Sequence, residues 1–422
     1  MTKTIHISNK KEMLKQGFVL SRLNNFMRKL VHGKLDSLSK GSIQIIEGDL
    51  KKTFGNTEVL LKATVSVYSP QFYYLLITRG SIGALESFMD GHWHCDDLVA
   101  LSRILIRDYS AANRLEKGFA WLSKPLLWLY THLNPNTKKG SVRNIQAHYD
   151  LSNDFFKLFL DKTLTYSCAF FSTPEISLEE AQIEKLDRLC RKLNLTAEDS
   201  LLEIGTGWGS MAIHAAQKYG CSVTTTTISK EQFDFASARV REAGLQDKIT
   251  ILQKDYRDLT GTFDKLVSIE MIEAVGPQFM SKFVKKCSSL INADGLIAIQ
   301  GITISDQNFK QYIRGTDFLR SYIFPGGSLI SIAQINEHFK NLTNMRFVHL
   351  EDITNHYALT LREWRERFNK KLDSIYSLGF STSFCRLWEF YLASCEAAFL
   401  ERHIGDVQMI FASPETNSTI RY

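Results

Sequence analysis

Five short apolar runs rich in β-branched residues alternate with helix-like segments through the middle of this 422-residue chain. They span residues 201–205, 222–227, 249–253, 265–269 and 295–300. Apolar strands separated by helices are typical of a parallel sheet that helices cover on both faces. Two later runs, 346–350 and 407–412, are expected to complete the sheet. The predicted fold class is therefore α/β, with a seven-stranded, Rossmann-like sheet.

A glycine-rich loop follows the first run, in the order Glu203-Ile-Gly205-Thr206-Gly207-Trp-Gly209. Glycines let the backbone turn tightly and approach a ligand closely, and the next helix offers free amides at its N-terminus. In such sheets ligands bind at the carboxyl ends of the strands. Taken alone, the loop fits a bound cofactor, a dinucleotide or merely a tight strand-to-helix turn.

The end of the second run bears on which cofactor is expected. A dinucleotide site usually has an acidic residue there for the ribose, whereas this chain has Thr226, Thr227 and, after a short turn, Gln232. Hydroxyl and amide groups can hold ribose hydroxyls instead. Asp255 and Tyr256 follow the third run and are placed to flank an adenine. For Thr224 and Thr225, simple β-propensity is the preferred interpretation.

The N-terminal part has a different pattern. Strand-like segments within 41–69 and helical spacing after Ser69-Pro70 and from Asp97 to Arg107 predict a smaller α+β domain. We place this domain at residues 1–111, a helical connector at 112–142 and the catalytic domain at 143–422.

The net charge of +6 is concentrated at the N-terminus, because the first forty residues carry nine Lys/Arg and two Asp/Glu. Apolar residues from Val19 to Val31 recur there at helical spacing. A basic amphipathic helix can lie on an anionic membrane surface or bind nucleic acid, and it can also simply pack on its own domain.

Several classes are not expected. The N-terminus has no apolar signal-peptide core, and no uncharged apolar stretch is long enough to span a membrane. The seven cysteines show no paired spacing, so neither a disulfide framework nor a metal site is predicted, and reduced thiols in the cytoplasm are the simplest interpretation.

From His148 onward, the motifs together resemble those of the cyclopropane-fatty-acyl-phospholipid synthases and mycolic acid cyclopropane synthases. The matching segments are His148-Tyr-Asp-Leu-Ser-Asn-Asp-Phe-Phe, Tyr166-Ser-Cys-Ala-Phe-Phe, Gly205-Thr-Gly-Trp-Gly, Thr227-Ile-Ser-Lys-Glu-Gln, Asp255-Tyr-Arg-Asp-Leu, Glu273-Ala-Val-Gly and Tyr322-Ile-Phe-Pro-Gly-Gly. In addition, Ser81-Ile-Gly-Ala-Leu-Glu-Ser-Phe-Met-Asp-Gly resembles the lipid-binding extension of the phospholipid-acting members.

The resemblance implies an S-adenosylmethionine-dependent methyltransferase sheet with a cap at roughly residues 302–342. The implied cofactor-binding residues are Tyr166, Ser167, Glu203, Gly205, Thr206, Gly207, Gly209, Thr227, Gln232, Asp255 and Tyr256. Phe318, Tyr322, Ile323 and Phe324 are expected to line an acyl channel, the alternative being a packed amphipathic helix.

The resemblance also implies the chemistry. The double bond of an unsaturated phospholipid acyl chain attacks the sulfonium methyl, and the resulting carbocation loses a proton from the new methyl to close a cyclopropane ring. The implied base is a bound bicarbonate, held by Cys168, Glu273, Gln300, the amide of Ile302, and Tyr357. Cys395 matches the position long labelled the active-site cysteine, although a pocket-lining role is preferred because the reaction requires no acyl-enzyme.

Three positions depart from the family pattern. Gln300 stands where many relatives carry His, Ala274 where a His commonly follows the glutamate, and Thr206 where Cys is usual. Because Gln cannot titrate, the first two departures leave a methyl-branched or methylene product as an alternative to the ring.

We accordingly expect a cytoplasmic enzyme that docks peripherally on the inner face of the membrane, acts on unsaturated phospholipid and forms a homodimer. The rivals are a methyltransferase for a small soluble acceptor and a non-catalytic lipid-binding protein on the same fold. A nucleic-acid enzyme is disfavoured because the chain lacks a Pro-Pro-Tyr-like motif and its basic charge is confined to the N-terminus.

Overall fold

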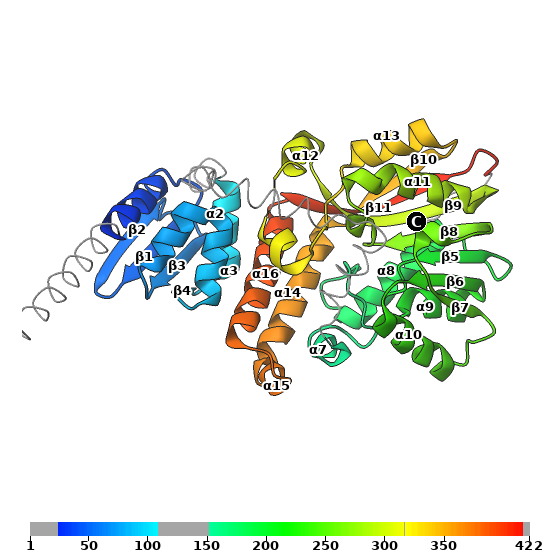
Figure 1. Ribbon diagram of the computed structural model, residues 1–422, viewed down its shortest axis with the longest axis horizontal. Coiled ribbons are helices and arrows are strands. Elements are labelled where there is room, and N and C mark those ends of the chain that lie inside the picture. The colour runs from blue at the N-terminus through cyan, green and yellow to red at the C-terminus, as the bar shows by residue number, and fades with distance from the viewer. Residues whose placement is uncertain (1–23, 109–151, 316, 417–422) are drawn as a thin grey trace, which may run out of the picture. The chain divides into compact units, whose positions relative to one another are not determined.

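The computed structural model describes residues 24–108, 152–315 and 317–416 (Figure 1). The connector at 112–142, along with His148 and Tyr149, lies outside this part of the chain. The described residues form two compact units. Residues 24–108 and 380–397 belong to the first unit, and residues 152–379 and 398–416, apart from 316, belong to the second.

The first unit is a small α+β domain. Its four strands are β1 (Ser42–Glu47), β2 (Leu50–Gly55), β3 (Lys62–Val67) and β4 (Trp93–Cys95), in the spatial order β2-β1-β3-β4. The unit also contains the helices α2 (Gln71–Met89) and α3 (Leu98–Arg107). The Asp97 side chain caps α3 by accepting from the amide of Ala100 at 2.8 Å, as an N-cap residue does. The helices and strands predicted here are confirmed.

Helix α16 (Thr382–Leu400) contributes its residues up to 397 to the first unit. Phe390 packs on Phe88 and Trp93, with ring centroids 5.8 and 6.4 Å apart, and Arg386 donates to the carbonyl of Phe88 at 3.1 Å. A segment far along the chain thus completes the core of the N-terminal unit.

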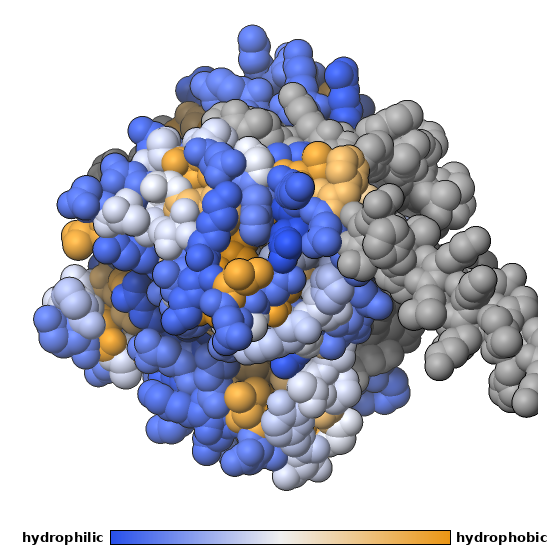
Figure 2. Space-filling model, turned by 90° about the vertical axis from the view of Figure 1, so that its left-hand side faces the viewer, coloured by the Kyte–Doolittle hydropathy of each residue, from blue (hydrophilic) through white to orange (hydrophobic). Residues whose placement is uncertain are grey.

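The described part of the basic N-terminal segment is a helix over residues 24–35. Met27, Val31 and Leu35 are buried, and Arg28 pairs with Glu47 at 3.1 Å. Packing on its own domain therefore accounts for this stretch. The face in Figure 2 is mostly hydrophilic and carries small, separate hydrophobic patches. None of the described helices has the length and apolar character needed to cross a bilayer.

The second unit is built on a seven-stranded sheet in the order β10-β11-β9-β8-β5-β6-β7. The strands are β5 (Ser200–Ile204), β6 (Ser222–Thr227), β7 (Ile249–Gln253), β8 (Phe263–Ile269), β9 (Ile291–Ile304), β10 (Arg346–Asp352) and β11 (Ile404–Ala412). The first five are parallel, while β11 runs antiparallel to β9 and β10 antiparallel to β11. The predicted fold class and strands are confirmed.

Helices cover both faces of this sheet (Figure 1). The helices of this unit are α7 (Asn153–Lys157), α8 (Leu178–Lys192), α9 (Ser210–Tyr219), α10 (Lys230–Glu242), α11 (Met280–Ser289), α12 (Asp306–Tyr312), α13 (Ile332–Leu342), α14 (Thr354–Lys370) and α15 (Leu372–Ser377). Successive strand residues point to opposite faces. Leu202 accordingly packs in a core with α11 and α13, whereas Leu201 packs with α8 and α9. Burial on both faces explains the uninterrupted apolar runs.

The chain reverses its direction of travel across the sheet between β5 and β8. It runs outward from β5 to β6 and β7, then returns to β8 and continues to β9. The carboxyl ends of β5 and β8 therefore flank the switch point, where open α/β sheets bind ligands.

Candidate active site

The glycine loop leaves β5 in a conformation that favours glycine. Gly205, Gly207 and Gly209 have φ angles of 106°, 52° and 88°. The amides of Gly205 and Thr206 both donate to the carbonyl of Thr226 at 3.1 Å, which ties the loop to the end of β6. A Cβ on Gly207 would meet no heavy atom of the described chain within 4 Å, so the loop is open on that side.

Glu203 precedes the loop on β5 and is buried. Its Oε2 has no hydrogen-bond partner among the described residues. Burial raises the pKa of the carboxyl to about 8, against the opposing effects of Thr225 and Lys185. Since buried polar atoms are normally satisfied, this oxygen marks a place for a ligand that donates a hydrogen bond or carries positive charge.

Thr227 and Gln232 lie together at the carboxyl end of β6. The Thr227 hydroxyl donates to the side-chain oxygen of Gln232 at 2.8 Å and accepts from the amide of Ser229 at 3.1 Å. Ser229 in turn caps α10 by accepting from the amide of Gln232 at 3.2 Å. The cap therefore holds both predicted residues at the edge of the sheet where the glycine loop lies.

Asp255 and Tyr256 follow β7. Arg257 donates from Nε and Nη2 to the two carboxylate oxygens of Asp255, at 2.8 and 2.6 Å. The Tyr256 ring packs edge-on against Phe283, with centroids 5.5 Å apart. Asp255 is thus held in place by Arg257, a residue the sequence prediction did not single out.

A carboxylate that was not predicted lies at the centre of the polar cluster beyond β8. Glu270 Oε1 accepts from the amide of Cys168 and from Gln300 Nε2, both at 2.8 Å. Its Oε2 accepts from the Tyr357 hydroxyl at 2.6 Å. The structure therefore brings the predicted residues Cys168, Gln300 and Tyr357 together, and it does so around Glu270.

Cys168 reaches this cluster through its backbone. Its thiol is fully buried, and Sγ lies 3.2 Å from the carbonyl oxygen of Ala169 and 3.8 Å from that of Ile353. Burial, with the nearby Asp406 and Glu270 carboxyls, raises the pKa of the thiol well above its usual value. A protonated thiol turned toward two carbonyls is a hydrogen-bond donor and not a nucleophile.

The amide of Ile302 donates to Glu273 Oε1. The other oxygen, Glu273 Oε2, is buried without a hydrogen-bond partner in the described chain. Burial and the neighbouring Glu270 carboxylate raise the pKa of Glu273 to about 8. These two predicted residues therefore lie beside Glu270, and the free oxygen is available to a ligand.

Two further buried ionisable groups in the cluster escaped prediction. Asp406 on β11 accepts from Gln300 Nε2 at 3.3 Å, and burial with the neighbouring Glu270 and Glu273 carboxyls raises its pKa well above the usual value. Lys185 on α8 is fully buried and donates to the Ser167 hydroxyl at 2.7 Å. The only sequence signal for either residue is a charge within an apolar helical face or strand.

Tyr166 lies in an aromatic cluster on the same unit, 5.1 Å from Trp364 and 5.4 Å from Phe156 between ring centroids. A short π-helix, Leu319–Ile323, holds the residues predicted to line an acyl channel, with Phe318 and Phe324 at its two ends. Within it, Tyr322 is 37% exposed and Ile323 is buried. Cys395 is buried on the part of α16 that belongs to the first unit.

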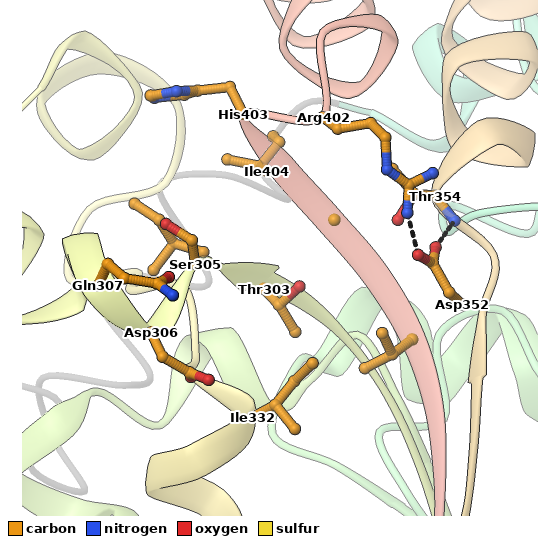
Figure 3. Close-up of a pocket in the computed structure, with 13 residues that line it drawn as sticks. Thr303, Ser305, Asp306, Gln307, Ile332, Asp352, Thr354, Arg402, His403 and Ile404 are labelled. Atoms are coloured by element: carbon orange, nitrogen blue, oxygen red, sulfur yellow. Dashed lines mark hydrogen bonds and ion pairs between the residues drawn. The ribbon is translucent and has the colours of Figure 1, made fainter.

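A separate pocket of about 230 Å³ opens beyond the ends of β9 and β11 (Figure 3). Thr303, Asp306 and His403 are among its lining residues, and Arg402 pairs with Asp352 at its edge. None of the predicted site residues lines it.

All seven cysteines are free, and the described residues contain no group of His, Cys, Asp or Glu side chains able to hold a metal ion.

Comparisons with known proteins agree on one relationship. A family model described as mycolic acid cyclopropane synthetase matches residues 136–409. The tuberculostearic acid methyltransferase UfaA1 of Mycobacterium tuberculosis is 38% identical over 338 residues, 78% of each chain. The cyclopropane-fatty-acyl-phospholipid synthase of Escherichia coli K12 is 35% identical over 355 residues, 83% of this chain and 88% of that protein.

Among solved structures, mycolic acid cyclopropane synthase CmaA1 complexed with SAH and CTAB superimposes with a TM-score of 0.60 at 30% identity. The superposition covers 64% of this chain and 98% of that one.

Proposed function

The chain belongs to the mycolic acid cyclopropane synthetase family, and on that premise we propose that it alkylates acyl chains of membrane phospholipids. It is an S-adenosylmethionine-dependent methyltransferase that transfers a methylene group to the double bond of unsaturated acyl chains. The phospholipid form of the acyl chain and the residue roles below are our proposal.

The close approach of Gly205 to Met271 supports the assignment of the site. A Cβ on Gly205 would lie 3.2 Å from the side chain of Met271, which sits in the sequence between Glu270 and Glu273. The glycine loop and the carboxylate cluster are therefore neighbours across the switch point. A ligand resting on the loop would present its reacting end to those carboxylates.

S-adenosylmethionine supplies an electrophilic methyl on a sulfonium centre. The open side of Gly207 gives room for it, and the unsatisfied Glu203 Oε2 suits its positive charge. Thr227, Gln232, Asp255 and Tyr256 would line the nucleoside end at the edges of β6 and β7. Tyr166 and Ser167 would close the site from the segment before α8.

The acyl side of the site must align a weak nucleophile. An alkene attacks a methyl group only when the two are held in line, and the carbocation that follows must be kept from water. Phe318, Tyr322, Ile323 and Phe324 would supply an apolar wall for the chain. These side chains would orient and shield the reactants and would form no covalent bond with them.

Membrane contact and assembly are also part of the proposal. The basic helix at 24–35 packs on its own domain but leaves Lys29 exposed, and positive side chains favour anionic lipid surfaces. We expect a homodimer that docks on the inner face of the membrane from the cytoplasm.

A second product class has support in the same comparisons. Two of the relatives are a tuberculostearic acid methyltransferase and a probable fatty acid methyltransferase of Pseudomonas putida, the latter 37% identical over 280 residues. A methylene or methyl-branched chain is therefore the alternative to the ring. A saturated branch would further require a hydride donor in a separate reaction.

The test uses the purified chain with methyl-labelled S-adenosylmethionine and vesicles of unsaturated phospholipid. We expect label in the acyl chains, with saturated vesicles and a soluble unsaturated acid as controls. Mild hydrogenation before mass spectrometry separates a cyclopropane, which resists, from a methylene group, which gains two hydrogens. Label in the soluble acid alone would overturn the phospholipid assignment.

A further inference from the structure

The Glu270 carboxylate is held by three donors, at 2.6 to 2.8 Å, that come from distant parts of the chain. They are the amide of Cys168, Nε2 of Gln300 on β9 and the hydroxyl of Tyr357 on α14. Three donors on one carboxylate fix the position of both of its oxygens. The three donors form a site of the kind that binds a small anion. In this protein the Glu270 carboxylate occupies that site.

The same residues are those that the family resemblance assigns to a bound bicarbonate. The remaining donor of that set, the amide of Ile302, is engaged by Glu273 Oε1. A bicarbonate would have to displace Glu270 or Glu273 from its donors and then lie beside three carboxyl groups, those of Glu270, Glu273 and Asp406. The donors are already occupied by carboxylate oxygens of the protein itself, so the residues present do not fit bicarbonate.

The backbone at Glu270 supports a specific role for the side chain. Its φ angle is 47°, in the left-handed region that a non-glycine residue adopts at a cost. The amide of Glu270 donates to the carbonyl of Gln300 at 2.9 Å, which fixes this conformation against β9. Residues held in such conformations cluster at active sites, because surrounding contacts must maintain them.

We propose that Glu270 is the general base of the reaction and takes the place of bicarbonate. This inference rests on the proposed function. The alkene forms a carbon–carbon bond to the donor methyl while the methyl–sulfur bond breaks, which leaves a carbocation on the acyl chain and releases S-adenosylhomocysteine. A C–H bond of the new methyl then supplies its electron pair to close the ring, and Glu270 accepts the proton.

The same base serves the methylene alternative. There a hydride first shifts from the methylated carbon to its cationic neighbour, and the new methyl then loses one proton to Glu270. Either product needs one proton acceptor and no oxidant or reductant. Glu270 is only half-buried, so it can return the proton to solvent between turnovers.

Two neighbouring residues limit the negative charge around Glu270. Burial and the Glu270 carboxylate raise the pKa of Asp406 well above its usual value, which disfavours a second negative charge beside Glu270. Burial lowers the pKa of Lys185, and the nearby Glu270 carboxylate opposes that shift by favouring the charged ammonium. Without these two groups the cluster would hold adjacent uncompensated negative charges.

The first test measures labelled methyl transfer to unsaturated phospholipid vesicles in buffer stripped of carbon dioxide, with and without added bicarbonate. We expect the wild-type rate to be the same in both. Glu270→Gln keeps the shape but cannot accept the proton, and turnover should fall by about 100-fold or more with S-adenosylmethionine affinity retained. Bicarbonate should not restore this variant, because the amide still occupies the donors.

The second variant is Glu270→Gly, which suits the positive φ and leaves the three donors empty. We expect it to fold, to be inactive in stripped buffer and to regain activity with added bicarbonate. Asn194→Gly is the control, because Asn194 has a φ angle of 49° and contributes no carboxylate. It should keep wild-type activity in both buffers.

The possible outcomes distinguish the role of Glu270 from the proposed function. A wild type that transfers methyl groups only when bicarbonate is present overturns the role of Glu270 and leaves the proposed function standing. Near-normal turnover of Glu270→Gln in stripped buffer does the same. Absence of transfer to phospholipid in either buffer, with folded protein that binds S-adenosylmethionine, counts against the proposed function itself.

Discussion

The Tyr357 hydroxyl donates a 2.6 Å hydrogen bond to Oε2 of Glu270, although the two residues are 87 positions apart in the chain. Tyr357 is buried on α14, where its ring stacks on Phe399 with centroids 4.3 Å apart. The stacking fixes the ring, so the hydroxyl is aimed at the carboxylate before any ligand arrives. Preorganised donors of this kind cost no rearrangement during the reaction.

Tyr357→Phe removes this donor while it keeps the stacked ring. Turnover should fall by about 10- to 100-fold because one oxygen of the proposed base loses its partner, and S-adenosylmethionine affinity should not change. Steady-state assays and calorimetry check both quantities. Tyr219→Phe is the matched control, because its hydroxyl donates to Asp187 at 2.9 Å on a different part of the unit. Equal losses of turnover in the two variants would remove Tyr357 from the site.

Gly207→Ala tests where the methyl donor lies. The φ angle of 52° makes the substitution cost about 1 kcal/mol, and the added Cβ projects into the open space above the loop. We expect at least about tenfold weaker S-adenosylmethionine binding by calorimetry. Gly244→Ala has a comparable φ of 67° and is equally free of neighbours in the described chain, so it should lose stability without losing affinity. Unchanged affinity in Gly207→Ala would place the donor elsewhere.

Much of this fold was predictable because burial on both faces of a sheet requires apolar strands. The five runs from 201 to 300 became parallel strands, and the capping box of Ser177 and Glu180 at the start of α8 is likewise set by residues close in the sequence. The glycine loop was also predictable, because its positive φ angles favour glycine and the glycines are visible in the sequence. These features depend on neighbours within a few residues.

The centre of the site was not predictable for the opposite reason. Glu270 follows a buried strand and looks like an ordinary loop residue in the sequence. Its role depends on strand register, since β8 and β9 pair Ile269 with Gln300 and so set that amide beside the carboxylate. Register and the docking of α14 are tertiary properties. The packing of 380–397 with the N-terminal unit is hidden for the same reason.

Binding of S-adenosylmethionine should release a proton from Glu203. Burial raises the pKa of that carboxyl to about 8, so the free protein holds it largely protonated near neutral pH. A positively charged ligand favours the ionised form, and affinity should therefore rise from about pH 6.5 to about pH 8 and then level off. Calorimetry in buffers of different ionisation enthalpy measures the proton count. Binding heats that do not depend on the buffer would exclude Glu203 from the contact.

Asp406→Asn should make the protein less sensitive to high pH. The folded pKa of Asp406 is raised, so the native state binds this proton more tightly than the unfolded chain and stability falls as pH rises past the unfolded value. The amide cannot titrate and avoids that loss. Urea unfolding at a series of pH values above the usual pKa range of an aspartate should show a free-energy difference that grows in favour of the variant until Asp406 itself ionises. A difference that stays constant across this range would contradict a protonated Asp406.

Lys185→Met tests whether the buried ammonium compensates the Glu270 carboxylate. Removing one partner from a buried set of charges costs about 3 to 5 kcal/mol, and here it also leaves the proposed base without its nearby cation. We expect lower stability together with lower turnover. Lys192→Met is the matched control, because Lys192 is equally buried on α8 but pairs with Glu351 and Gln408. It should lose stability alone.

Combining Lys185→Met with Glu270→Gln should recover part of the lost stability, since neither charge then remains unpaired. Strictly additive losses in that double variant would show that the two residues do not interact.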